Sequence, residues 1–294
     1  MIRIMLDSGS DQNQALREAY DVEVVPMTII LGQDQYLDDE DFSLETLHAY
    51  MRQGKQPRTS QISPQMAIDR FEAAAKAGDD VIFISIFKQL SGTYQVAVNA
   101  MEDVKDRYPN FQGAVVDSRS AAGAGTILYL HGQELIKAGY DFDQVHQQLE
   151  QSAQELSVYL AVDDLDWLVK GGRLSKTVGK IGSLLKVKPF LSINDKGITK
   201  EGVVRGSDRV YTKMANTFLE EIDRYEGQYL IVSHVDRWEM AEKVRDYIID
   251  QIGPVNIGIF EVSPVISCHV GLGGVGVFGY KKKPDLFEPV TFKS

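Results

Sequence analysis

Small hydroxyl residues and a glycine follow an apolar run in the first third of the chain. The run, Val81–Phe87, is largely β-branched, which is typical of a buried parallel strand. Ser91, Gly92 and Thr93 come soon after it, before a helix expected over residues 94–107. The first N–H groups of a helix lack intrahelical partners and lie at the positive end of its dipole, so an anion can bind there. The stretch therefore predicts either an anion-binding turn or a plain N-cap at Ser91, and taken alone it leaves both open.

Other hydroxyl residues of the first half lie where predicted strands end or where a predicted helix begins. Together with one aspartate, they are Asp7, Ser8, Thr59, Ser60 and Ser118. Ligands of doubly wound α/β sheets bind beyond the carboxyl ends of the strands. Several such residues at one edge of a sheet therefore predict a site for a small acidic molecule.

Three side chains of the second half could add hydrogen bonds or charge to such a site. His269 lies in the glycine-rich stretch 268–274, which we expect to be a loop. It is either a satisfied turn residue or a cationic or hydrogen-bonding partner of an acidic ligand. Arg173 and Arg205 each adjoin a glycine and could reach across a cleft, although a lone arginine is more often a solvated surface charge.

The patterns of several common catalytic sites do not occur in the sequence. The stretch 171–173 lacks the lysine and the spacing of a phosphate-binding loop, and the glycines of 271–274 do not match a dinucleotide fingerprint. There is no G-x-S-x-G elbow, and the five histidines show no H-E-x-x-H spacing. Cys268 is the only cysteine, so neither a disulfide nor a zinc site is expected. We therefore predict no catalytic residue, metal or cofactor.

The composition excludes other classes of function. Of 294 residues, 42 are acidic and 31 are basic, which gives a net charge of −11. This balance disfavours a nucleic-acid partner, because neutralising phosphates requires a basic face. No apolar run approaches the roughly 18 residues of a membrane span. With its single cysteine, the chain is expected to be a cytoplasmic protein without integral membrane association.

The order of predicted elements places the candidate residues in two lobes. Strands and helices alternate through the first half, where Ser63-Pro64 and Asp141 with Gln144 mark helix starts. The second half contains a predicted hairpin turn at 194–197 and a helix expected over 176–185. We therefore expect an α/β fold. Residues 1–157 form a doubly wound, mostly parallel sheet, and residues 158–294 form an α+β lobe with a mixed sheet.

An ordered set of short motifs resembles the DegV family of bacterial proteins. The motifs span nearly the whole chain and are Thr59–Pro64, Leu90–Gln95, Asp117-Ser118, Lys170–Leu174, Lys188-Pro189 and His269–Gly271. The family comprises fatty-acid-binding proteins that act as the binding subunit of a bacterial fatty acid kinase. The resemblance implies two α/β lobes with a long-chain fatty acid buried between or within them. It also implies a separate ATP-dependent kinase subunit that converts the bound carboxylate to an acyl phosphate for phospholipid synthesis.

The resemblance implies a role for each matching residue. Binding of the fatty acid carboxylate is implied for Thr59, Ser60, Ser91, Gly92, Thr93 and His269. Support near the head group is implied for Asp7, Ser8, Ser118 and Arg173, and contact with the kinase for Arg205. The family usually has D-S-T-A-D where this chain has Asp7–Asp11, so the chain departs from the pattern at Gly9 and Ser10. It departs again at Ile62, and at Leu272 and Gly274 after His269.

Two other classes of function stay open from the residues. The chain could be a stand-alone acyl hydrolase or phosphotransferase that uses Ser91 as nucleophile, with His269 as the base. The lack of a nucleotide-binding motif disfavours a kinase that acts alone. A regulatory binding module is a third interpretation, without support from particular residues.

Overall fold

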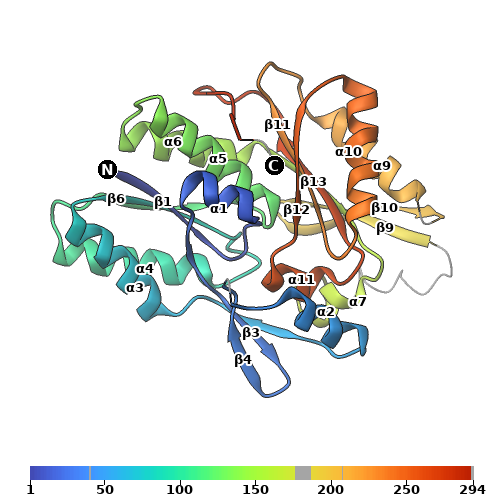
Figure 1. Cartoon of the computed structure of the whole chain (residues 1–294), viewed down its shortest axis with the longest axis horizontal. Coiled ribbons are helices and arrows are strands. Elements are labelled where there is room, and N and C mark those ends of the chain that lie inside the picture. Colours follow the sequence, from blue (N-terminus) through green and yellow to red (C-terminus); the bar gives the residue numbers. More distant parts are fainter. Residues whose placement is uncertain (40, 176–186, 207, 293–294) are drawn as a thin grey trace.

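The computed structural model describes residues 1–39, 41–175, 187–206 and 208–292 (Figure 1). Their strands form three sheets, with the orders β2-β1-β6-β7, β10-β9-β8-β13-β11-β12 and β4-β3-β5. The predicted α/β fold is confirmed. The predicted helix over 176–185 lies outside the described residues.

The first sheet is parallel throughout and is covered by helices on both faces. Its strands are β1 (Ile2–Asp7), β2 (Glu23–Val25), β6 (Asp80–Ser85) and β7 (Gly113–Asp117). Helices α3 (Pro64–Ala77) and α4 (Thr93–Arg107) cover one face, and α5 (Gly123–Lys137) and α6 (Phe142–Gln154) cover the other (Figure 1). This is the doubly wound arrangement that the sequence predicts.

Two helices of this half begin as their sequences indicate. The Ser63 hydroxyl accepts the Met66 N–H at 3.5 Å, and Pro64 occupies the first turn of α3. At the start of α6, the Asp141 carboxylate accepts the Gln144 N–H at 2.9 Å, and the Gln144 side chain accepts the Asp141 N–H at 3.1 Å. Reciprocal capping of this kind satisfies backbone donors that the helix itself cannot.

The second sheet is mixed. Its strands are β8 (Leu156–Ala161), β9 (Val187–Asn194), β10 (Gly197–Arg205), β11 (Tyr229–His234), β12 (Asn256–Glu261) and β13 (Val275–Tyr280). Helices α9 (Arg209–Glu221) and α10 (Trp238–Ile252) lie beside it in Figure 1 and bury a separate apolar cluster against it. The predicted hairpin turn joins β9 to β10 in antiparallel register.

The short helices α7 (Asp166–Lys170) and α11 (Pro264–Val270) lie close together below this sheet in Figure 1.

A small third sheet corrects one expectation. It consists of β3 (Thr28–Leu31), β4 (Asp34–Leu37) and β5 (Arg58–Ser60), with α1 (Gln14–Tyr20) before it in the chain and α2 (Leu44–Arg52) between β4 and β5. Thr59 and Ser60 therefore lie on a strand that pairs with β3 and not at the edge of the first sheet. The sequence does not indicate β5 because its three residues are polar and two of them are exposed.

Helix α5 joins the two halves. It packs against β1 and β6 of the first sheet and against β11 and β13 of the second. A Cβ atom on Gly125 would lie 2.0 Å from the Ser10 Oγ, and one on Gly123 would lie 2.7 Å from Ile231. The glycines therefore permit contact with both sheets, and one core cluster extends from Ile4 to Phe292 across both halves. A domain boundary near residue 157 stays a prediction.

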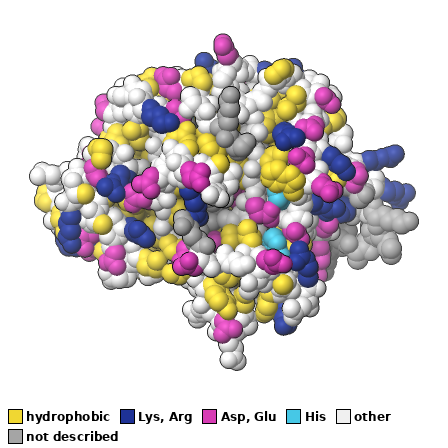
Figure 2. Space-filling model, viewed as in Figure 1, with side chains coloured by type: hydrophobic (Ala, Val, Ile, Leu, Met, Phe, Trp, Pro, Cys, Tyr) yellow, Lys and Arg dark blue, Asp and Glu magenta, His cyan; other side chains and the backbone are white. Residues whose placement is uncertain are grey.

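The outer surface mixes both signs of charge. On the face drawn in Figure 2, the described Lys and Arg side chains are interspersed with Asp and Glu and form no continuous basic stripe. Within the described residues, no helix combines the length and the apolar character needed to cross a membrane.

The contact at Gly125 can be tested by substitution. Alanine normally favours a helix interior by about 1 kcal/mol over glycine. We expect Gly125→Ala instead to lower the free energy of unfolding by about 1–3 kcal/mol, because its Cβ would overlap Ser10. Urea unfolding followed by circular dichroism measures the change. Adding Ser10→Gly should restore most of the loss, and an unchanged loss in the double variant would contradict the proposed overlap.

Candidate functional site

A cavity of about 580 Å³, a volume that includes its open mouth, lies between the two halves. This is within the range of roughly 300–1,000 Å³ that is usual for small-molecule sites. Most of its wall is aliphatic, with contributions from Met27, Ile86, Leu90, Ala121, Leu160, Leu168, Ile193, Ile198, Val265, Ile266 and Val270. The loops that follow β6 and β7 supply some of these side chains, and strands β8, β9 and β10 with helices α7 and α11 supply most of the others, so neither half forms the cavity alone.

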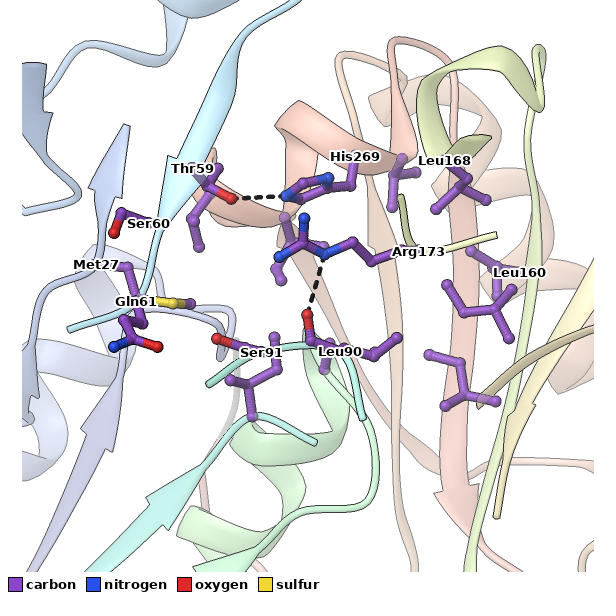
Figure 3. A pocket seen from close by; sticks show the side chains of 17 residues that line it. Met27, Thr59, Ser60, Gln61, Leu90, Ser91, Leu160, Leu168, Arg173 and His269 are labelled. Carbon is purple, nitrogen blue, oxygen red and sulfur yellow. Dashed lines mark hydrogen bonds between the residues drawn. The ribbon is translucent and has the colours of Figure 1, made fainter. Parts of the chain in front are cut away.

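The polar side chains of the wall gather toward one end of the cavity. They are Thr59, Ser60, Gln61, Ser91, Arg173 and His269. In Figure 3 the Arg173 and His269 side chains point toward the other four, and the leucines at positions 160 and 168 lie at the opposite end. Five of these six are predicted site residues, and the structure brings them to one cavity from β5, α11 and two loops. Gln61 has no predicted role, although it lies within the quoted motif.

Thr59 and His269 form a direct contact across the cavity. The Thr59 Oγ1 lies 2.8 Å from the His269 Nε2 (Figure 3). His269 is on the last turn of α11, which corrects the expected loop: Pro264 begins the helix and Gly271, with φ of +81°, ends it. Burial and the nearby Arg173 guanidinium lower the pKa of His269 to about 3. The ring is therefore neutral at pH 7 and acts as a hydrogen-bonding group and not as a cation.

Gly171, two residues before Arg173, explains part of the Lys170–Leu174 motif. A Cβ atom at Gly171 would lie 2.3 Å from the His269 Nδ1, so a larger residue would displace the ring. The Nδ1 atom is buried and has no hydrogen-bond partner among the described residues. The ring is thus held by the Thr59 contact on one side and by the backbone at Gly171 on the other.

Ser91 lies just before α4. The helix begins at Thr93 with Gly92 at the N-cap, so Ser91 is not the cap itself. Its Oγ accepts the Thr93 N–H at 3.2 Å and lies 2.9 Å from the Thr93 Oγ1. Ser91 lines the cavity, whereas Gly92 and Thr93 do not. The Thr93 side chain is fully buried, and its Oγ1 also accepts the Ile62 N–H at 3.5 Å. Thr93 therefore stabilises the turn that carries Ser91.

Arg173 is fixed by two backbone carbonyls. Its Nε donates to the Leu90 carbonyl at 3.0 Å (Figure 3), and its Nη1 donates to the Gly171 carbonyl at 2.7 Å. Burial lowers the pKa of Arg173, but an arginine remains charged in either case. Among the described residues that line the cavity, it alone carries a formal charge at pH 7. The site thus offers one cation among neutral donors.

Two predicted head-group residues of the first turn support the wall without lining it. The buried Asp7 carboxylate accepts the Ile86 N–H at 2.7 Å and the Gly9 N–H at 2.9 Å. Burial raises the pKa of Asp7 to about 6. The Ser8 Oγ accepts the Met27 N–H at 3.0 Å. Asp7 and Ser8 therefore hold the backbone of two residues that line the cavity, Ile86 and Met27.

The remaining predicted residues lie away from the cavity. Ser118 donates to the Ser120 carbonyl at 2.9 Å and so shapes the loop that leads to Ala121. Arg205 is the exposed last residue of β10 and does not line the cavity.

The arrangement around Ser91 does not resemble a nucleophile paired with a base. Its hydroxyl contacts Thr93, whereas the His269 ring contacts Thr59. Within the part of the chain that the structure describes, no histidine or carboxylate is hydrogen-bonded to Ser91. An activated serine needs such a base within about 3 Å.

Known proteins share both the sequence pattern and the fold. A DegV domain-containing protein of Clostridium acetobutylicum is 30% identical over 289 residues, which cover 96% of this chain and 99% of the relative. A solved structure from Thermus thermophilus, described as fatty acid binding of a DegV family protein, is 26% identical with a TM-score of 0.84 and covers 95% of this chain and 99% of that one.

A second solved structure shows the fold at lower identity. It is the fatty acid kinase B3 protein of Streptococcus pneumoniae loaded with linoleic acid, which is 22% identical with a TM-score of 0.86 and covers 95% of this chain and 99% of that chain. The model of an uncharacterised protein family, named DegV, matches residues 1–282. The match extends over nearly the whole sequence, and the chain therefore belongs to the DegV family.

Proposed function

We propose that this protein binds a long-chain fatty acid, with the carboxylate at the polar end of the cavity and the acyl chain along its aliphatic wall. The observation that carries the proposal is the division of one cavity into a hydroxyl-rich end with a single arginine and an otherwise aliphatic wall. A fatty acid likewise has a polar carboxylate at one end and an aliphatic chain. The fatty acid binding described for the Thermus thermophilus relative supports the assignment.

The polar end can satisfy a carboxylate without a basic cluster. In the tautomer that carries its proton on Nε2, the neutral His269 ring donates to Thr59 and leaves the Thr59 hydroxyl proton for the ligand. In the same way, when the Thr93 hydroxyl donates to Ser91, and not to the Met27 Sδ at 3.4 Å, the Ser91 proton is left free. Two hydroxyl donors then converge on one carboxylate. A buried carboxylate needs several such donors, because leaving it without partners is strongly unfavourable.

Arg173 adds the compensating charge. Its Nε and Nη1 are occupied by backbone carbonyls, whereas its Nη2 has no hydrogen bond within the described residues. The guanidinium is therefore oriented before a ligand arrives and presents one free edge. Fixing the cation in advance reduces the conformational entropy that binding would otherwise cost.

The aliphatic wall supplies the affinity. A buried methylene contributes about 0.8 kcal/mol, so roughly 14 methylenes give on the order of 11 kcal/mol before the cost of ordering the ligand. The polar end contributes less to affinity and sets the orientation of the ligand. The head group then lies near Ser60 and Gln61, which are both exposed.

The protein acts, in this proposal, as a carrier and not as an enzyme. A separate ATP-dependent fatty acid kinase would phosphorylate the carboxylate that the carrier presents. Ser91 lacks a base among the described residues, which disfavours a stand-alone hydrolase. The kinase name of the Streptococcus pneumoniae relative, a protein with the same fold, suggests the partner.

Mass spectrometry tests the proposed function. Denatured, freshly purified protein should release free long-chain fatty acid in about equimolar amount, with no mass added to the polypeptide. A covalent acyl adduct on Ser91 would support the enzyme instead. A protein that neither retains fatty acid nor binds added palmitate or oleate would exclude the carrier.

Ser91→Ala should weaken fatty acid binding and leave the fold intact. Removing a hydroxyl from a buried charged acceptor costs roughly 1.5–3 kcal/mol, or about ten- to a hundredfold in affinity. The melting temperature of the lipid-free variant should stay within a few degrees, since losing a helix-start hydroxyl costs only about 1 kcal/mol. Ser63→Ala, at the α3 N-cap outside the cavity, is the matched control. Unchanged affinity in Ser91→Ala would reject the site.

His269→Gln should reduce the sensitivity of the lipid-free protein to acid. The pKa of His269 is about 3 in the folded protein and about 6.5 when unfolded. Because the unfolded chain binds the extra proton between these values, stability falls as the pH drops through this window. Between pH 7 and pH 4.5 the free energy of unfolding of the wild type should fall by about 2.5 kcal/mol more than that of the variant. Urea unfolding at both pH values, with His146→Gln as control, measures the difference, and equal losses would contradict a buried neutral ring.

Arg205→Ala should retain bound lipid and lose turnover with the kinase. Arg205 is exposed and lies outside the cavity, so its removal leaves the fatty acid site unchanged. Lipid content and acyl phosphate formation, measured on the same preparation, separate the two effects. Arg209→Ala, a nearby exposed arginine on α9, is the control. An empty protein or a normal turnover would reject the role of Arg205.

A further inference from the structure

Helix α11 contributes more to the cavity than its length suggests. Four of its seven residues line the wall: Val265, Ile266, His269 and Val270. The same short helix therefore carries both the ring that contacts Thr59 and part of the aliphatic surface. A small shift of the helix would change the polar end and the wall together.

The start of α11 is held by aspartates from distant parts of the chain. Ser263 occupies the N-cap, but its side chain makes no capping hydrogen bond, and Pro264 has no N–H. The Ser263 N–H donates to the Asp11 carboxylate at 3.0 Å, and the Val265 N–H donates to the Asp38 carboxylate at 3.1 Å. These two carboxylates satisfy the backbone donors that the helix start leaves free.

Asp38 also contacts the opposite wall of the cavity. Its backbone N–H donates to the Met27 carbonyl at 2.8 Å, and the Met27 N–H donates to the Ser8 Oγ at 3.0 Å. The Ser8 hydroxyl also lowers the pKa of the Asp38 carboxyl, against the effect of burial. Met27 and Val265 both line the cavity, so one aspartate joins two of its walls.

Burying the Asp38 side chain costs free energy, which indicates that this residue has a structural role. Its exposed fraction is 5%, and no described lysine, arginine or histidine forms an ion pair with it. Burial raises the pKa of its carboxyl to about 7. A buried carboxylate without a counter-ion is unfavourable unless its hydrogen bonds compensate.

We propose that Asp38 is a positioning residue for the fatty acid site, acting through the Val265 N–H to hold α11, and so the His269 ring, in reach of Thr59. The inference rests on the proposed fatty acid binding. Asp38 does not line the cavity. Its effect on the ligand can pass through α11 or through Met27, and only the route through α11 depends on His269.

The test is a double-mutant cycle on the full chain, with dissociation constants for palmitate and oleate as the readout. Asp38→Ala should weaken binding about threefold or more in the wild-type background. In a His269→Ala background the same substitution should weaken binding by a clearly smaller factor, because the ring it positions is gone. Equal factors in both backgrounds, or no weakening in either, would overturn the proposal.

Two further variants separate positioning from general damage. Asp38→Asn keeps an oxygen that can accept the Val265 N–H, so it should bind within about twofold of wild type. An Asn variant as weak as Asp38→Ala would overturn the role of this hydrogen bond. Asp34→Ala, at the exposed start of β4, the strand that ends one residue before Asp38, is the matched control and should change nothing. If Asp38→Ala does not fold, Asp38→Ser replaces it in the cycle, since it keeps a polar group at the buried position but its shorter side chain reaches less far toward the Val265 N–H.

A second readout does not depend on the ligand. In protein labelled with ¹⁵N-histidine, the His269 imidazole signals are those lost in His269→Ala. Asp38→Ala should shift or broaden them, and Asp34→Ala should not. Unchanged His269 signals in folded Asp38→Ala would overturn the proposal, whereas a wild-type protein that binds neither palmitate nor oleate would reject only the proposed function.

Discussion

The close packing of α5 between the two large sheets is the constraint on which the site depends. Helix α5 contacts β1 and β6 on one side and β11 and β13 on the other. Gly123 and Gly125 allow this approach because side chains there would overlap Ile231 and Ser10. The cavity lies between the loops of one sheet and the strands of the other. Its width therefore depends on how closely the two sheets pack against α5.

The two ends of the cavity are built by different physical means. The aliphatic wall draws on side chains that any packed α/β interface could supply. The polar end instead depends on pairwise contacts between distant segments, such as Thr59 with His269 and Arg173 with the Leu90 carbonyl. Such contacts are directional and fail with small displacements. Much of the surrounding structure, including the Asp7 and Asp38 hydrogen bonds, fixes backbone positions behind them.

Local signals in the sequence account for much of the fold. The Ser63-Pro64 start of α3, the capping pair of α6 and the buried strand before Ser91 are each encoded within a few residues, and all appear as predicted. The sequence does not predict strand β5, because that strand is short and polar. It does not predict helix α11 either, because the helix ends directly before the glycines of 271–274, which indicate a loop. Five of the residues on the polar wall are found by motif, but Gln61 and Asp38 depend on contacts that only the folded chain shows.

The pairing of β5 with α11 also determines when in its synthesis the protein can hold a ligand. Thr59 leaves the ribosome long before His269, and residues 121–198 of the wall emerge between them. The N-terminal sheet can form early, as the first elements of a chain generally do during synthesis. The cavity is closed only when the residues after β12 have been added. A ligand that occupies it therefore stabilises the completed chain, by an amount set by the ligand concentration relative to its dissociation constant, and contributes nothing to a truncated product.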